Sequence, residues 1–117
     1  MPSSNPTLRS ALVMLERAGK ERKAPIWTTA SKLLGAPEGR KVEVNVGRLS
    51  RLAAEGEAVF VPGKVLGTGV MGKKVTVGAF AFSSAARSSI ESAGGSALSI
   101  KQFMEKFPEG SGVKLVK

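Results

Sequence analysis

Several side chains that carry enzyme chemistry are missing from this sequence. It has no cysteine, histidine, tyrosine or aspartate, and all nine of its acidic residues are glutamate. The lack of cysteine excludes disulfides and thiolate metal sites. Most general acid–base and nucleophilic devices use one of these four residue types. The composition therefore predicts a protein that is not an enzyme and that has no catalytic residues, metal or cofactor.

Long apolar runs are absent as well. No stretch approaches the ~20 apolar residues of a membrane-spanning helix. The first residues, "MPSSNPTLRS", have no apolar segment of the kind found in a secretory signal. Together with the lack of cysteine, these features lead us to expect a cytoplasmic protein without a membrane-spanning helix.

Positive charge is the property that the sequence has in excess. The chain of 117 residues has the size of one domain, is 42% hydrophobic and has a formal net charge of +9. Residues 1–74 hold 13 Lys and Arg against 6 Glu, whereas residues 75–117 hold 5 against 3. The excess predicts an acidic partner, either nucleic acid or an anionic membrane surface. The first part of the chain carries most of the charge for that partner.

A glycine-rich motif, "VLGTGVMGKKVTV", matches two nucleotide-binding patterns. Gly67, Gly69 and Gly72 have the spacing of a dinucleotide fingerprint, and Gly67, Gly72 and Lys73 have most of the spacing of a P-loop. A P-loop needs Ser or Thr after its lysine and an acidic residue elsewhere for magnesium, but Lys74 follows Lys73. Both motifs must also open a helix, and the sequence that follows alternates like a strand. These features argue against a mononucleotide site.

Two interpretations of the glycine motif then remain open. Strand-like sequence lies on both sides of it, so the motif could be the turn of a hairpin whose glycines supply positive φ angles. Alternatively, its bare backbone could approach the phosphates of a polynucleotide, with Lys64, Lys73 and Lys74 beside it.

The N-terminal part of the sequence predicts two helices. The first begins with Asn5 as the N-cap and Pro6 in the first turn, and it ends at Gly19. A charged connector, residues 20–23, follows; it is either a solvated loop or a nucleic-acid contact. "PIWTTASKLLGAP" is the second helix, and Trp27 lies on its apolar side, so we expect a core residue and not a base-stacking platform.

A third helix is predicted over "VEVNVGRLSRLAAEG", residues 42–56. At 100° per residue its apolar positions share one narrow arc, which contains Val42, Val46, Leu49 and Ala53. Polar and cationic residues occupy the adjacent arc, which Leu52 and Glu55 interrupt: Lys41, Asn45, Arg48 and Arg51, with Arg40 just before the helix. A solvated face would more usually mix charges of both signs, and arginine fits phosphate with two hydrogen bonds. We therefore interpret this arc as a nucleic-acid contact.

The C-terminal part alternates between strands and helices. A helix capped by Ser83 or Ser84 follows the strand at 75–82, and a short strand, "SALSI", comes after it. Ser99 and Gln102 form a capping box for the last helix, whose apolar stripe we assign to the core. "GVKLVK" is a final strand. This order predicts an α/β fold, with a helical N-terminal part followed by a layered strand and helix part.

Several of these segments together resemble a known family. They are "VNVGRL", "VFVPGKVLGTGV", "VTVGAFAFSSAA", "IESAGG" and "FPEGSGVKLV", with "NPTLRSALVML" and "IWTTASKLL" before them. The chain is similar to archaeal and eukaryotic large-subunit ribosomal protein eighteen, a family related through its C-terminal half to bacterial large-subunit protein fifteen. The resemblance implies an irregular β-β-α superhelical domain without catalysis. It also implies binding to large-subunit ribosomal RNA and to neighbouring ribosomal proteins, with no membrane partner and no small-molecule substrate.

The predicted organisation is one domain, with a mainly helical basic part at 1–56 and a strand and helix platform at 57–117. The residues predicted to contact RNA are Arg9, Arg17, Lys20, Arg22, Lys23, Arg40, Lys41, Asn45, Arg48, Arg51, Lys64, Gly67, Gly69, Lys73 and Lys74. Two other hypotheses belong to different classes. One is a free-standing nucleic-acid-binding protein associated with chromatin or transcripts, and the other is a small nucleotide-binding enzyme.

Overall fold

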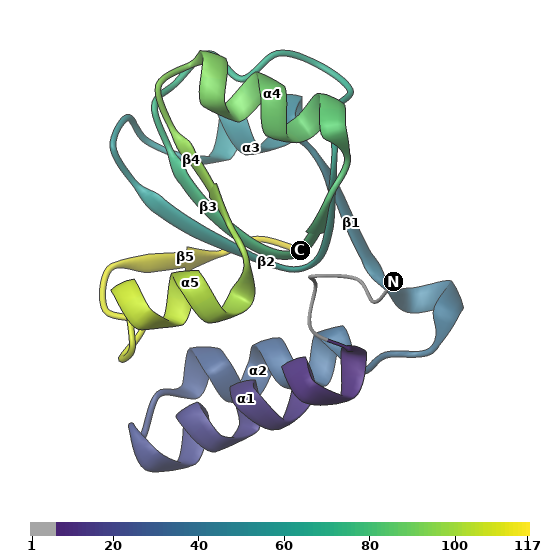
Figure 1. Cartoon of the computed structure of the whole chain (residues 1–117), viewed down its shortest axis with the longest axis vertical. Helices are drawn as coiled ribbons and strands as arrows, with labels where there is room; N and C mark the ends of the chain where they lie inside the picture. Colours follow the sequence, from purple (N-terminus) through teal and green to yellow (C-terminus); the bar gives the residue numbers. More distant parts are fainter. Residues whose placement is uncertain (1–6) are drawn as a thin grey trace.

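A parallel sheet lies between two layers of helices in the computed structural model, which describes residues 7–117 apart from the side chain of Glu38 (Figure 1). The elements in chain order are α1 (Leu8–Glu21), α2 (Pro25–Leu34), the 3-10 turn η1 (Glu38–Arg40), β1 (Val42–Asn45), α3 (Val46–Leu52), β2 (Ala58–Leu66), β3 (Thr76–Phe82), α4 (Ser84–Ser92), β4 (Ser96–Leu98), α5 (Ile100–Lys106) and β5 (Val113–Leu115). This architecture confirms the predicted α/β class.

All strand pairs in the sheet are parallel, and the strand order is β1-β2-β3-β4. β5 also pairs with β2, at residues 58–60, whereas β1 pairs with it at residues 63–66. The short strands β5 and β1 therefore share one edge of β2, and β3 occupies the other edge. β1, which comes from the basic N-terminal part of the sequence, is thus built into the sheet.

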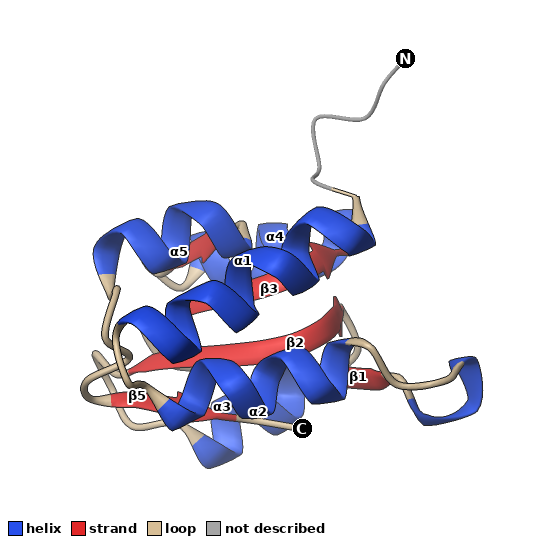
Figure 2. Ribbon diagram, turned by 90° about the horizontal axis from the view of Figure 1, so that it is seen from below, coloured by secondary structure: helices blue, strands red, loops and turns tan. Residues whose placement is uncertain are grey.

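Alternating side chains of β2 supply both cores. Val59 and Val61 belong to a cluster that α3 and α4 cover, and Phe60 belongs to a second cluster beneath α1, α2 and α5. Figures 1 and 2 show these two groups of helices on opposite faces of the sheet. Such two-sided burial is usual for a parallel sheet.

Trp27 is fully buried in the second cluster, which confirms that it is a core residue. Its ring meets that of Phe60 edge-on, with centroids 5.2 Å apart. The indole N–H donates to the carbonyl oxygen of Pro108 at 2.9 Å, so its polar atom is satisfied inside the protein. The ring is therefore not available to stack on a base.

The ends of α1 differ from the prediction. Thr7 is the N-cap, and its hydroxyl accepts a hydrogen bond from the Ser10 amide at 3.1 Å; Asn5 and Pro6 lie outside the described residues. Gly19 does not end the helix. It is buried against Thr28 of α2, where a side chain would collide, so this glycine serves close helix packing. As a result, α1 includes Lys20 and continues to Glu21.

The third predicted helix is only partly correct, because residues 42–45 form strand β1 and the helix begins at Val46. The sequence "VEVN" fits a strand as well as a helix, since its valines alternate with polar residues. Pairing with residues 63–66 of β2 decides between the two. The apolar positions Val46, Leu49 and Ala53 are buried as predicted.

The C-terminal elements follow the prediction closely. The Ser83 hydroxyl caps α4 by accepting from the Ala86 amide at 3.0 Å. Both bonds of the capping box at α5 are present, 3.2 Å from the Gln102 amide to the Ser99 hydroxyl and 3.0 Å from the Ser99 amide to the Gln102 side chain. The expected short strands are β4 and β5.

Candidate nucleic-acid interface

Helix α3 exposes two arginines to solvent, because its opposite side is buried in the core. Val46 and Leu49 have no exposed surface, whereas Arg48 and Arg51 are exposed. Asn45 is the N-cap, but its side chain makes no capping hydrogen bond. The predicted separation of an apolar and a cationic edge is therefore present within α3.

The glycine motif lies in the loop at residues 67–75, which connects β2 to β3. These strands are parallel, so the expectation of a hairpin is wrong and the loop is a crossover. The β-branched composition of β2 and the alternation of β3 identified the two strands, but neither signal carries information on the direction of their pairing. Crossovers between parallel strands usually contain a helix and a dozen or more residues. The loop at residues 67–75 is shorter than a dozen residues and contains no helix.

The glycines allow this short crossover to lie against α3 and α4. Gly69 has φ +91°, and a Cβ on it would be 2.7 Å from the Cα of Gly47. The Gly47 amide donates to the Thr68 carbonyl oxygen at 3.1 Å. Gly67 lies similarly close to Ala85 in the first turn of α4. Close packing within the protein therefore accounts for Gly67 and Gly69, both of which were predicted to contact RNA.

The amides of the loop also have partners inside the protein. The Gly72 amide donates to the Ser50 hydroxyl at 2.9 Å, and the Met71 amide to the Ser89 hydroxyl at 3.3 Å. The Lys74 amide donates to the Glu55 carboxylate at 3.0 Å. In a phosphate-binding loop such amides point at the ligand. The geometry thus disfavours a mononucleotide site.

We use the name α3–loop surface for four exposed residues of α3, its N-cap and the loop that packs against it: Asn45, Arg48, Arg51 and Lys74. The two carboxylates that follow α3 in the sequence have partners elsewhere. Glu55 holds the Lys74 amide, and Glu57 accepts from the Ala54 amide at 2.9 Å and lies 3.7 Å from Lys114. The pair of Glu57 and Lys114 is the only ion pair among the side chains that the structure describes. No described carboxylate therefore neutralises the two arginines of the surface.

Two of the predicted contact lysines are engaged within the protein. Lys73 donates to the Ala53 carbonyl oxygen at 2.7 Å, and Lys41 to the Leu34 carbonyl oxygen at 3.4 Å. Both acceptors lie at helix C-termini, where a cation is favourable. Lys114 likewise donates to the carbonyl oxygen of Leu52, the last residue of α3, at 2.8 Å. These lysines hold helix ends in place, so less of their hydrogen bonding is available to a partner.

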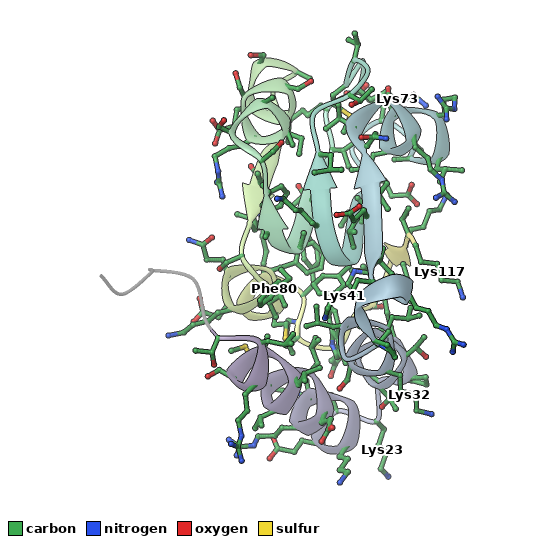
Figure 3. The ribbon with its side chains drawn as sticks, turned by 90° about the vertical axis from the view of Figure 1, so that its right-hand side faces the viewer. Lys23, Lys32, Lys41, Lys73, Phe80 and Lys117 are labelled. Carbon is green, nitrogen blue, oxygen red and sulfur yellow. The ribbon has the colours of Figure 1, made fainter. Side chains whose placement is uncertain are left out.

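The other predicted residues do not gather at one place. Arg17, Lys20, Arg22 and Lys23 lie on α1 and the turn after it, Arg9 lies near the start of α1, Arg40 ends η1 and Lys64 lies on β2. Figure 3 shows Lys73 near one end of the molecule, Lys23 at the other end and Lys41 between them. The longest extent of the molecule is 34 Å. The predicted set is therefore spread along the molecule and is not a single pocket.

Exposed cations outside the predicted set are Lys32, Arg87, Lys101, Lys106, Lys114 and Lys117. In fact, every Lys and Arg is exposed except Lys41 and Lys73, which are half-buried. These six cations occur singly along the sequence, whereas six of the predicted ones form the adjacent pairs Arg22–Lys23, Arg40–Lys41 and Lys73–Lys74. Neither pattern shows which cations gather on one surface.

Comparisons with known proteins agree on one family. The family model that describes ribosomal proteins 50S-L15 and 50S-L18e together with a related 60S protein matches residues 19–98. The chain is 42% identical to the large ribosomal subunit protein eL18 of Methanococcus maripaludis, over 97% of this chain and 95% of the relative. It is 41% identical to the protein of the same name from Haloarcula marismortui, over the full length of both. The eL18 protein of Methanopyrus kandleri is 42% identical over 97% of this chain and 93% of its own.

Neither a membrane span nor a metal site was found in the described part of the chain. Within residues 7–117, no helix is long and apolar enough to cross a membrane. The same residues contain no group of three or more His, Cys, Asp or Glu side chains that could hold a metal ion.

Proposed function

The chain belongs to the family of ribosomal proteins 50S-L15 and 50S-L18e and is a structural constituent of the large ribosomal subunit, and from this premise we propose that it holds ribosomal RNA mainly through phosphate contacts of the α3–loop surface. Its relatives are named as ribosomal proteins and not as enzymes. As part of the large subunit, the chain is located in the cytoplasm.

One observation carries this proposal: Arg48 and Arg51 are exposed on a helix whose opposite side is fully buried. A helix fixed in this way holds the backbone of its arginines in place before RNA arrives, so that only their side chains have to be ordered on binding. Arginine pairs with phosphate through two hydrogen bonds. Phosphate contacts position a protein on RNA and carry little sequence information.

The glycine loop supports the same interface indirectly. It is hydrogen-bonded to α3 through the Gly47 amide and the Ser50 hydroxyl, and it carries the exposed Lys74. We propose that neighbouring large-subunit proteins and further RNA contact the cations of α1 itself and of the turn after it, which lie at the other end of the molecule. The whole chain then acts as a single domain between them.

A salt titration tests the proposal. Binding of the full chain to a large-subunit RNA fragment is measured between about 50 and 200 mM salt, where each phosphate contact contributes about 0.9 to the slope of log K against log salt on duplex nucleic acid. With about five to eight contacts we expect a slope near −4 to −7. The double variant Arg48→Ala/Arg51→Ala is expected to reduce the steepness by about 2.

A matched control separates local contact from net charge. The double variant Lys101→Ala/Lys106→Ala removes the same two charges from exposed positions on α5. We expect it to keep the slope of the parent protein to within about half a contact. Equal losses in the two double variants would mean that only the overall charge matters, and the proposed surface would then be wrong.

A further inference from the structure

A β-bulge interrupts the sheet beside an aromatic ring. β2 pairs with β3 in register from Ala58 to Val61, and the register then shifts so that Lys64 lies opposite Ala81. Two residues of β2, Pro62 and Gly63, therefore lie opposite the single residue Phe80 of β3, and proline has no N–H for the ladder. Bulges of this kind are frequent next to functional sites. Phe80 is only half-buried at this bulge, so part of its surface is accessible.

A pocket of about 320 Å³ lies at this bulge. Its apolar lining includes Phe80, Pro62 and Leu34, and Lys41, Lys64 and Glu43 are its charged residues. Figure 3 shows Phe80 and Lys41 where the sheet meets the pair of helices. Small-ligand pockets begin at about 300 Å³, so this one has the size for a single planar group.

We propose that this pocket takes one unpaired guanine of the RNA partner, stacked on the ring of Phe80. The inference rests on the proposed RNA-binding function and names a subsite for it. RNA-binding proteins commonly stack splayed bases on aromatic rings and read their Watson–Crick edges. Lys64 is exposed at the pocket and is placed to hold a phosphate next to the base, and it lies outside the α3–loop surface.

Glu43 selects guanine among the four bases. A carboxylate only accepts hydrogen bonds, and it is satisfied best by two adjacent donors. On its Watson–Crick edge guanine offers the N1–H and the exocyclic amino group side by side, whereas adenine and cytosine pair one donor with an acceptor and uracil has one donor between two acceptors. Glu43 is exposed on β1, at the edge of the pocket, where it is accessible to such a base.

The test uses uridine-rich single-stranded RNA oligonucleotides that differ only in one central base. The isotope-labelled full chain is titrated with each and followed by NMR. The guanine oligonucleotide is expected to bind about tenfold more tightly than the all-uridine one and to shift the resonances of the Phe80 ring, Val42 and Ala81. Glu43→Gln keeps the shape of the side chain but introduces an amino donor, so it is expected to abolish the guanine preference; because it also removes one negative charge, any change in overall affinity should be the same for the guanine and the all-uridine oligonucleotides.

Two further variants separate the possible outcomes. Phe80→Leu keeps an apolar side chain and should lower the affinity for the guanine oligonucleotide about tenfold, in a protein whose amide spectrum remains folded. Arg48→Ala/Arg51→Ala should weaken all the oligonucleotides alike and retain the guanine preference.

Several results would overturn the subsite. RNA binding with equal affinity for the four bases, or without shifts at Phe80, rejects it while the proposed function stands. An unchanged guanine preference in Glu43→Gln also rejects the subsite. So do NMR contacts between Phe80 and residues 1–6 in the free protein, because the chain itself would then fill the pocket. No RNA binding at all by the parent chain would reject both the subsite and the proposed function.

Discussion

Replacement of Gly69 by alanine tests whether the crossover loop is seated on α3. The residue has φ +91°, and its new Cβ would be 2.7 Å from the Cα of Gly47. A non-glycine residue with such a backbone costs about 1–3 kcal/mol, and forcing a methyl group against packed backbone costs about another 1–3 kcal/mol. We therefore expect Gly69→Ala to lower the free energy of unfolding by about 2–6 kcal/mol in urea denaturation.

Gly56 provides the matched control for this substitution. It has a similar backbone angle, φ +81°, but no atom lies within 4 Å of a Cβ placed on it. Gly56→Ala should lose only the backbone contribution, about 1–3 kcal/mol. The difference between the two variants measures the contact with Gly47 alone. If both alanine variants lose the same stability, the loop does not lie against α3 and our explanation of the glycine motif fails.

Three other predictions concern the core and the absence of a nucleotide site. Leu49→Ala should lower the free energy of unfolding by about 2–5 kcal/mol in a urea melt through a core cavity; a loss below about 1 kcal/mol would place that side of α3 outside the core. Trp27→Phe should lose about 1–3 kcal/mol, because the Pro108 carbonyl then lacks its donor, and an unchanged melt would contradict that bond. Calorimetric titration with ATP, GTP or NAD in the presence of magnesium should give no saturable heat, and binding tighter than about 100 μM would show that the loop amides are available after all.

Local signals in the sequence predicted the elements that depend on local chemistry. Ser99 and Gln102 satisfy each other within one turn of helix, and Ser83 caps α4 in the same way, so neighbouring residues contain all the information required. The strands β2 and β3 were also predicted from local signals, β2 from its β-branched residues and β3 from the alternation of its apolar residues.

Non-local contacts decide the features that were predicted wrongly. Residues 42–45 form a strand because β2 offers them an edge, and a valine-rich stretch of four residues fits both periods. Gly19 continues α1 because Thr28 packs against it, although glycine usually ends a helix. The parallel direction of β2 and β3 depends on the loop lying against α3, which no single segment reveals.

The candidate interface was predicted in part for the same reason. Arg48 and Arg51 alternate with core positions of α3, and this pattern can be read from the sequence. The internal bonds of Lys41 and Lys73 depend on helix ends that the fold brings near them. The pocket at Phe80 was missed, although Pro62 and Gly63 within a strand are a signal for a bulge.

Retention on the large subunit under increasing salt is the most direct test of the central claim. Large subunits carrying the parent chain, Arg48→Ala/Arg51→Ala or Lys101→Ala/Lys106→Ala are sedimented through sucrose gradients of rising salt. We expect the parent chain and the lysine variant to remain with the subunit to the same salt concentration, and the arginine variant to dissociate at a lower one. If the arginine variant stays bound as long as the parent chain while all three proteins are folded, the α3–loop surface does not hold the RNA.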